Sequence, residues 1–491
     1  MGLYAGFDCS TQSLTVVVLD ADTRRLVFTD AVAFPEPFRT TTDPQVVHAS
    51  PQMWKATLET VLERLARTID RGRLRAVSGS AQQHGSVYCG ATPGTLTRNA
   101  APIWMDASTS RECDEIEAAL GGPHAVAQLT GSRCFPRFTG PQIRKFARES
   151  PDEYARTRRI HLVSSWMASL LAGEHVPIDH ADGSGMNLMD IRTRQWSAAA
   201  VAATAPGLAS RLPPLVPSSS VVGRLDPQWQ ERFGFPPTDV IAWSGDNPCS
   251  LVGIGLFDEG QLAVSLGTSD TIFGPMNGPR VSADGTGHVF ASPLGRYMGI
   301  TVFRNGALAR ERLRDGFGMS WLDFSEALRR TPAGNDGATM LPWFEPEITP
   351  LVPRAFLQRY DLANQPPERH VRAIVEAQAM ALARHSEWMR VRPRSIHATG
   401  GAAANREILQ VIADVFDAEV LRFESTDSAA LGAALRAFQA HSGLPWPRVC
   451  EGFVTPVGDP ITPIPSHVDV YRRLRPVYAQ REAAAVDSLH P

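Results

Sequence analysis

Lysine is nearly absent from this chain of 491 residues: it occurs only at Lys55 and Lys145, whereas arginine is abundant. Neither lysine lies in a G-x-x-x-x-G-K-[ST] segment, so a P-loop, in which a lysine contacts nucleotide phosphates, is excluded. We interpret the excess of arginine as compositional bias rather than as a device for binding anions. Any nucleotide phosphate would therefore have to be held without a P-loop lysine.

Cysteine pairs and long apolar segments are missing too. The six cysteines are scattered without a C-x-x-C pair, which favours a reduced, cytoplasmic protein over a disulfide framework or a zinc site. No apolar run approaches the roughly 20 residues of a membrane-spanning helix, and the N-terminus enters a strand pattern at once, so we expect no signal peptide. The net charge of -3 points to no nucleic-acid or membrane partner.

The length and the periodicity together predict the fold class. A chain of this size suggests about two to four domains. Strands are predicted at the beginning of each half and helices after them, so we predict an α/β protein of two domains, each with a mixed sheet headed by a hairpin, and a boundary near residue 254. The Pro-rich segment 206–220 is predicted to be an extended surface linker, residues 161–172 a helix, and residues 333–368 mostly loop.

One pattern, a strand followed by a hydroxyl-rich turn and a second strand, occurs twice. The turns read Asp8-Cys9-Ser10-Thr11 near the start and Gly267-Thr268-Ser269-Asp270 past the middle. Such turns present backbone N–H groups and hydroxyls that can hold phosphate oxygens without lysine, and the Asp8 carboxylate is a suitable ligand for Mg²⁺, usually through water. Each turn alone could be an ordinary hairpin, but two copies favour a clamp on one polyphosphate.

Three further segments carry candidate site residues. Asp246, between Gly245 and Asn247, could serve as the base that deprotonates an alcohol or could simply cap a helix. His84 follows a predicted strand, where ligands of α/β proteins usually bind, although a surface histidine explains it as well. The small residues from Gly400 to Asn405 would let an adenine approach the backbone, or they form a plain glycine turn.

The order of these motifs along nearly the whole chain resembles that of the FGGY-family carbohydrate kinases. Within the family, the segments Gln82–Tyr88, Leu129–Arg133 and Ser184–Leu188 make it most similar to xylulokinases of the eukaryotic type. The motifs that carry the family resemblance are Asp8–Thr11, Gln82–Gly85, Trp104–Asp106, Phe138–Pro141, Asp182–Gly185, Gly245–Asn247, Ser265–Ser269 and Thr399–Gly401.

The resemblance implies two actin-like (ribonuclease H-like) ATPase domains, residues 1–254 for the sugar and 255–491 for ATP, with the active site in the cleft between them. It implies phosphorylation of D-xylulose by ATP with Mg²⁺. Asp246 would be the catalytic base, and Asp8 would help to hold the metal. The sugar would contact His84, Arg137, Asp246 and Asn247. The nucleotide would contact Ser10, Thr11, Gly267, Thr268, Trp321, Gly400, Gly401 and Asn405.

Other functions remain open on these residues. A sister kinase for ribulose, gluconate or glycerol is the nearest alternative, and a non-catalytic sugar sensor or an actin- or Hsp70-like ATPase module is another. A phosphatase with an aspartyl nucleophile requires a D-x-D motif. Ser10 stands two residues after Asp8, which argues against this class. Cys9 and Ala377 depart from the family pattern without removing a catalytic group. We expect a monomer or a homodimer.

Overall fold

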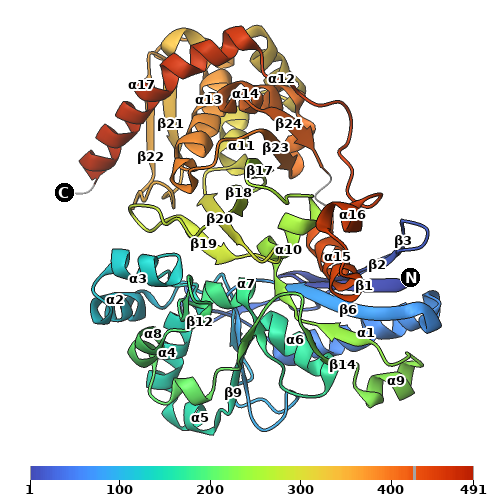
Figure 1. The fold of residues 1–491 in the computed structure, drawn as a ribbon. Coiled ribbons are helices and arrows are strands. Elements are labelled where there is room, and N and C mark those ends of the chain that lie inside the picture. The colour runs from blue at the N-terminus through green and yellow to red at the C-terminus, as the bar shows by residue number, and fades with distance from the viewer. Residues whose placement is uncertain (1, 424–426, 490–491) are drawn as a thin grey trace.

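Two mixed α/β lobes lie one above the other in the computed structural model, which describes residues 2–423 and 427–489 (Figure 1). The lower lobe is built on a seven-stranded sheet with the order β14-β15-β6-β1-β2-β3, and β16 also pairs with β6. The strands β1, β6, β15 and β16 run parallel, and the others run antiparallel to their neighbours. These strands are β1 (Leu3–Cys9), β2 (Ser13–Asp20), β3 (Arg25–Ala33), β6 (Leu74–Ala81), β14 (Val221–Arg224), β15 (Asp239–Ile241) and β16 (Ser244–Gly245).

The upper lobe is built on a six-stranded sheet with the order β19-β20-β18-β17-β23-β24. Here β17, β23 and β24 are parallel, and β18, β20 and β19 continue the sheet in antiparallel pairs. These strands are β17 (Gln261–Leu266), β18 (Asp270–Met276), β19 (His288–Ala291), β20 (Tyr297–Phe303), β23 (Ser395–Thr399) and β24 (Glu419–Arg422).

Helices cover both sheets, and small sheets fill the periphery. In the first half the helices are α1 (Pro51–Thr68), α2 (Ser110–Ala119), α3 (Pro123–Thr130), α4 (Thr139–Glu149), α5 (Pro151–Arg156), α6 (Val163–Ala172), α7 (His180–Gly183), α8 (Ala198–Thr204), α9 (Pro227–Phe233) and α10 (Asp246–Gly253). In the second half they are α11 (Ala307–Gly316), α12 (Trp321–Arg330), α13 (Pro367–Arg384), α14 (Arg406–Phe416), α15 (Ser428–Ser442), α16 (Trp446–Cys450) and α17 (Pro465–Leu489). The remaining strands are β4 (Arg39–Thr40), β5 (Val47–Ala49), β7 (Ser86–Cys89), β8 (Ala101–Pro102), β9 (Arg159–Leu162), β10 (Ile178–Asp179), β11 (Met189–Asp190), β12 (Gln195–Trp196), β13 (Leu215–Val216), β21 (Thr339–Trp343) and β22 (Phe356–Tyr360).

Each large sheet opens on the predicted hairpin. In the first, Asp8 lies opposite Thr15; in the second, Leu266 lies opposite Asp270. The strands that lead into both turns are almost wholly buried, because their neighbours pair on both sides and helices cover the faces. The turns therefore occupy equivalent places, each at the end of an inner strand of its sheet.

One local prediction is wrong and two are inexact. The segment 333–368 is mostly loop, as predicted, but it also contains the hairpin β21–β22, which was hidden by Pro342 in its first strand. A two-stranded sheet tolerates the proline, since one edge of β21 has no partner strand. Residues 161–172 form a helix only from Val163, because Arg159–Leu162 pairs with β7. The segment 206–220 is not a surface linker, since its β13 pairs with β10.

Helix α15, from the last part of the chain, packs on β1 and β6 of the lower lobe (Figure 1). The approach is close enough that a Cβ placed on Gly6 would collide with the backbone of Ala430 and Ala434, so glycine is required in this strand. The end of the chain thus completes the cover of the first sheet, while the division at residue 254 remains a prediction. None of the helices within the described residues is long and apolar enough to cross a membrane.

Candidate active site

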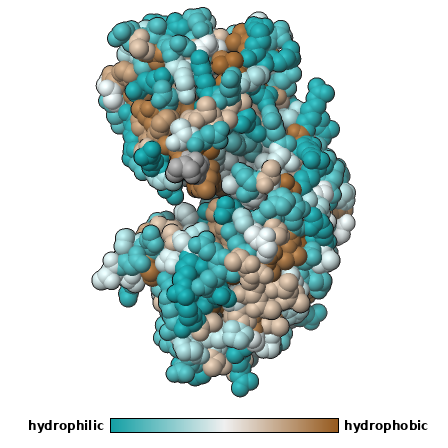
Figure 2. Space-filling model, turned by 90° about the vertical axis from the view of Figure 1, so that its left-hand side faces the viewer, coloured by the Kyte–Doolittle hydropathy of each residue, from teal (hydrophilic) through white to brown (hydrophobic). Residues whose placement is uncertain are grey.

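A cavity of about 750 Å³ lies between the two lobes, and Figure 2 shows the surface hollowed where they meet. All four predicted sugar-binding residues line this one cavity, together with side chains from the upper lobe that the motifs did not indicate. The lower lobe contributes, among others, Gln83, His84, Trp104, Arg137, Asp246 and Asn247, and the upper lobe contributes His288, Phe290, Arg304 and Glu347.

Asp246 is the first residue of α10 and is partly exposed to the cavity. The N-cap is Gly245, so the interpretation of Asp246 as the capping residue is wrong. Asp246 Oδ1 accepts hydrogen bonds from the backbone N of Asn247 at 2.8 Å and from its Nδ2 at 3.0 Å. The same Nδ2 donates to Gln83 Oε1 at 2.9 Å, so the Asn247 amide fixes the carboxylate relative to the lower lobe.

The electrostatics of Asp246 suit a general base. Burial, followed by the nearby charge of Asp8, raises the pKa of Asp246 from 3.8 to about 7. Burial also raises the pKa of Asp8 to about 6, with Asp427 adding to the effect and the neighbouring Ser80 opposing it. A base whose pKa lies near neutrality combines a useful ionised fraction with a real affinity for the proton that it removes.

Asp8 also fits the role of a metal ligand. Its Oδ1 atom is buried and has no hydrogen-bond partner among the described residues. A buried carboxylate oxygen without a protein partner is usually satisfied by a cation or by an ordered water. The described part of the chain contains no group of three or more carboxylate, histidine or cysteine side chains placed to hold a metal. The Asp8 carboxylate is a ligand of the kind that Mg²⁺ takes, since this ion usually binds one or two carboxylates and completes its shell with water and substrate phosphates.

His84 is buried and held in a sparsely populated backbone conformation, with φ of 73°. Its Nδ1 lies 2.9 Å from the carbonyl oxygen of Gly185; since a carbonyl accepts, Nδ1 carries the proton. Burial, with a contribution from Arg137, lowers the pKa of His84 to about 3. The ring is therefore neutral, and its Nε2 offers an acceptor lone pair. Strained residues persist where the surroundings fix them, often at functional sites.

Arg137 joins the two lobes at the cavity. Its guanidinium lies over the rings of Phe135 and Phe138, at 4.9 and 5.6 Å, and donates to His288 Nε2 at 3.0 Å. Burial, followed by the charge of Arg304, lowers the pKa of Arg137 to about 10. His288 belongs to β19 of the upper lobe, and no sequence signal indicated it: a histidine within a buried apolar strand resembles a core residue.

The predicted nucleotide residues of the upper lobe lie on neighbouring elements. Gly400, with φ of 90°, packs so closely on the end of β17 that an added Cβ would lie 2.6 Å from the Leu266 carbonyl oxygen. Asn405 caps α14 through its side-chain oxygen and donates to Ser325 Oγ on α12 at 2.7 Å. Trp321, exposed at the start of α12, thus lies on a helix tied to the glycine turn.

The remaining predicted nucleotide residues occupy the two hairpin turns. Gly267 and Thr268 follow β17 directly, next to the Leu266 carbonyl on which Gly400 packs. In the first turn, the Ser10 hydroxyl donates to the Ser13 carbonyl at 3.0 Å, and the Thr11 hydroxyl accepts from Trp104 Nε1 at 2.8 Å. The structure therefore ties the first turn to the segment that carries Trp104, which forms part of the cavity wall.

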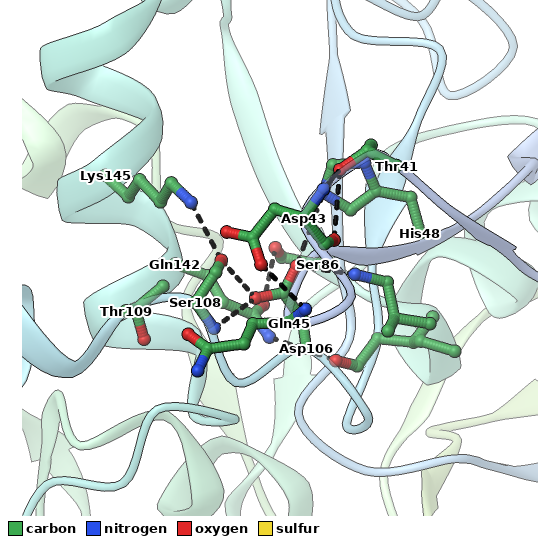
Figure 3. Close-up of polar contacts among 12 residues, drawn as sticks. Thr41, Asp43, Gln45, His48, Ser86, Asp106, Ser108, Thr109, Gln142 and Lys145 are labelled. Carbon is green, nitrogen blue, oxygen red and sulfur yellow. Dashed lines mark hydrogen bonds and ion pairs between the residues drawn. The ribbon is translucent and has the colours of Figure 1, made fainter.

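Asp106, two residues after Trp104, lies within a cluster of polar side chains that includes His48, Ser108 and Lys145 (Figure 3). It is buried, and its carboxylate accepts from the backbone N of Val47 at 3.1 Å and from the hydroxyl of Ser108 at 2.6 Å. Burial opposes ionisation, but hydrogen bonds led by those from His48 and Ser108 hold the pKa of Asp106 below its usual value. Lys145 donates to the same Ser108 hydroxyl at 2.8 Å. Although Asp106 reaches the cavity, its oxygens are used to fix the loop that carries Trp104.

The site thus combines a poised carboxylate, an orphaned carboxylate suited to Mg²⁺ and a polar cavity between two similar α/β lobes, the arrangement of a phosphotransferase. Residues 3–253 match the N-terminal domain of the FGGY family of carbohydrate kinases, and residues 262–441 match its C-terminal domain. The chain belongs to this family, as the order of its motifs predicted.

Its relatives include full-length sugar kinases. The chain is 40% identical to the xylulose kinase of Rattus norvegicus, over 97% of this chain and 96% of the relative, and 39% identical to xylulose kinase 2 of Arabidopsis thaliana, over 90% and 87%. Among solved structures, the xylulose kinase from Rhodospirillum rubrum superposes with a TM-score of 0.90 at 20% identity, covering 100% of both chains. This likeness confirms the predicted fold of two actin-like α/β domains.

Proposed function

We propose that this carbohydrate kinase transfers the γ-phosphoryl group of ATP to the 5-hydroxyl of D-xylulose. The observation that carries the reaction is the placement of Asp246, with its pKa near 7, in a cavity that both lobes line. The similarity over nearly the full length to xylulose kinases supports the choice of sugar. A site for a pentulose needs several hydrogen-bonding groups in a small volume, and this cavity supplies them.

Each sugar-binding role follows from a protonation state. Asp246 accepts the proton of the attacking hydroxyl, and Asn247 holds the carboxylate in place. His84 accepts a hydrogen bond from a sugar hydroxyl at Nε2, because its Nδ1 proton is already donated to Gly185. Arg137 donates to the sugar with the N–H groups that His288 does not engage, since a guanidinium carries five donors.

The nucleotide would be held by the two turns and by the glycine segment. Ser10 and Thr11 on one side, and Gly267 and Thr268 on the other, contact the phosphates. The adenosine lies against the surface formed by Trp321, Gly400, Gly401 and Asn405. Asp8 would hold Mg²⁺, which when bound neutralises negative charge on the phosphates. Closure of the lobes excludes water and so prevents hydrolysis of ATP.

A sister kinase for another pentulose or polyol is the alternative favoured by the fold, since a gluconate kinase from Lactobacillus acidophilus also superposes, with a TM-score of 0.89. A sugar sensor without activity is disfavoured by the intact carboxylates at residues 8 and 246. The six cysteines are free and buried, which supports a reducing compartment, and we propose the cytoplasm. We also propose a monomer or a homodimer.

A substrate panel tests the proposal. The purified chain is assayed with ATP and Mg²⁺ for ADP formation on D-xylulose, D-ribulose, gluconate and glycerol, and the product is identified by mass spectrometry and ³¹P NMR. We expect D-xylulose to give the highest kcat/KM and a phosphate on C5. A higher kcat/KM with another of these compounds overturns the choice of sugar. The Asp246→Ala variant should lose phosphorylation and still bind ATP; retained turnover removes Asp246 as the base.

A further inference from the structure

Arg304 stands at the junction between the sugar cavity and the second hydroxyl-rich turn. It directly follows Phe303, the last residue of β20, which pairs with Asp270 at the end of that turn. Two residues beyond Asn305, the backbone N of Ala307 donates to the Gly267 carbonyl at 2.9 Å. The backbone around Arg304 therefore lies against the turn proposed to hold ATP phosphates, while Arg304 itself lines the cavity that contains Asp246.

The backbone of Arg304 is held in place independently of its side chain. The buried carboxylate of Glu347 accepts from the backbone N of Arg304 at 2.6 Å and from that of Asn305 at 3.1 Å. It also accepts from Asn305 Nδ2 at 2.8 Å. These bonds fix the backbone at the end of β20, and they engage the main chain of Arg304 rather than its guanidinium.

The charge of the Arg304 guanidinium has no carboxylate partner within ion-pair distance in the described ranges 2–423 and 427–489, although the residue is exposed to the cavity. Arg310, six residues later, shows the opposite case: it is buried and pairs with Asp270 at 2.8 Å. Arg137 and Arg304 both line this cavity, and the charge of Arg304 contributes to the lowered pKa of Arg137. The carboxylates of Asp246 and Glu347 line this cavity as well, but within the described ranges neither lies at ion-pair distance from Arg304.

The two phosphate-binding turns provide no cation of their own. Neither residues 8–15 nor residues 265–271 contain a lysine or an arginine. In phosphoryl transfer, negative charge is spread over the three equatorial oxygens of the migrating group, and a preorganised cation beside that group stabilises the transition state. An arginine suits this task because its planar fork can make two charge-assisted hydrogen bonds to phosphate oxygens.

We propose that Arg304 binds the phosphoryl group as it passes from ATP to the sugar and then holds it as the phosphate of the product. The bond between the γ-phosphorus and the β,γ-bridging oxygen breaks, a bond from the sugar oxygen to phosphorus forms, and the hydroxyl proton passes to Asp246. Arg304 donates hydrogen bonds only and exchanges no proton. The inference rests on the kinase reaction of the proposed function and applies to whichever sugar the chain phosphorylates.

Steady-state kinetics of Arg304→Gln and Arg304→Lys test this role, with the sugar that gives the highest kcat/KM in the wild type. We expect Arg304→Gln to lower kcat by about 10²- to 10³-fold, the usual loss when a donor to developing charge is removed, and to leave the KM for the sugar within about threefold. Arg304→Lys should recover part of kcat, because the positive charge is kept and the fork is lost. Arg472→Gln, which removes an exposed arginine of α17, is the matched control and should match the wild type.

Binding of the product separates phosphate recognition from sugar recognition. By isothermal titration calorimetry, Arg304→Gln should weaken the sugar phosphate at least tenfold and leave the free sugar nearly unchanged. An equal loss for sugar and sugar phosphate overturns the proposal, because Arg304 would then be a sugar ligand. Unchanged kcat in Arg304→Gln also overturns it. Circular dichroism and thermal melting identify a folding defect in Arg304→Gln, and the test then rests on Arg304→Lys. A lysine variant with the kcat and the sugar-phosphate affinity of the wild type overturns the contact of the arginine guanidinium with the phosphoryl group. A loss of kcat and of sugar-phosphate affinity, with the affinity for the free sugar unchanged, supports it.

Discussion

Replacing Asp246 by asparagine should make the enzyme both slower and more stable. The carboxamide keeps the size of the side chain and can still accept a hydrogen bond from the backbone N of Asn247, which lies 2.8 Å from Asp246 Oδ1. It cannot take a proton at neutral pH, so the general-base contribution, typically about 10²- to 10⁴-fold in rate, is lost. The gain in stability comes from removing a charge that the folded protein holds at a disadvantage.

The size of that gain follows from the pKa. A rise from 3.8 to about 7 corresponds to roughly 4 kcal/mol at about 1.4 kcal/mol per pKa unit. Asp246 is partly exposed to the cavity, so solvent screening reduces this figure, and we expect Asp246→Asn to raise the free energy of unfolding by about 2–3 kcal/mol at pH 8. The raised pKa of an acid means that the folded state binds the proton more tightly. The advantage of asparagine is therefore absent below about pH 4, grows up to about pH 7 and stays constant above it.

Urea denaturation at pH 5 and at pH 8 measures the effect, followed by fluorescence of the ten tryptophans. The exposed Asp487→Asn variant in α17 makes the same charge change at the surface and serves as the control. The wild-type kcat/KM should also fall about tenfold for each pH unit below 7, because the protonated base is inactive. An Asp246→Asn protein that is no more stable at pH 8 than the wild type refutes the assigned electrostatics, and so does a wild-type kcat/KM that is flat between pH 6 and 8.

Other variants test the sugar pocket, the core and the glycine turn. His84→Ala should raise the KM for the sugar about tenfold or more, equivalent to about 1.4 kcal/mol, with the KM for ATP unchanged; an equal rise in both would contradict the placement of His84 at the sugar. Arg310→Met should cost about 3–5 kcal/mol in urea denaturation, because it leaves the buried Asp270 unpaired, and a second change of Asp270 to Asn should recover much of the loss. Gly400→Ala should destabilise the protein by about 1–3 kcal/mol, since φ is 90° there, whereas Gly401→Ala, where an added Cβ meets nothing within 4 Å, should leave stability unchanged and raise the KM for ATP.

Much of the fold could be predicted from local patterns. The two hairpins were predicted because buried strands give continuous apolar runs and the turns between them are short and polar. The start of helix α1 is also encoded locally, since Ser50 accepts a hydrogen bond from the backbone N of Met53 and Pro51 is the first helical residue. The hairpin β21–β22 was missed because Pro342 in the first strand argues against a strand. Such a proline is tolerated only when the strand has an unpaired edge, which is a property of the sheet.

The sequence by itself determined the chemistry that is available: two hydroxyl-rich turns without a cation, a carboxylate between Gly245 and Asn247, and the order of motifs that marks the family. These features are local in the chain, so they survive without coordinates. These local features identify the chemical groups that are available, but the protonation states of those groups and their partners in space stay undetermined.

Only the tertiary structure decided which groups have shifted pKa values and which groups lie close together. The pKa of Asp246 is set by burial and by Asp8, which is remote in the chain, and the tautomer of His84 is set by the carbonyl of Gly185. Arg304 enters the cavity from the opposite lobe. Desolvation and Coulomb interactions depend on distances through space, and no spacing along the sequence encodes them.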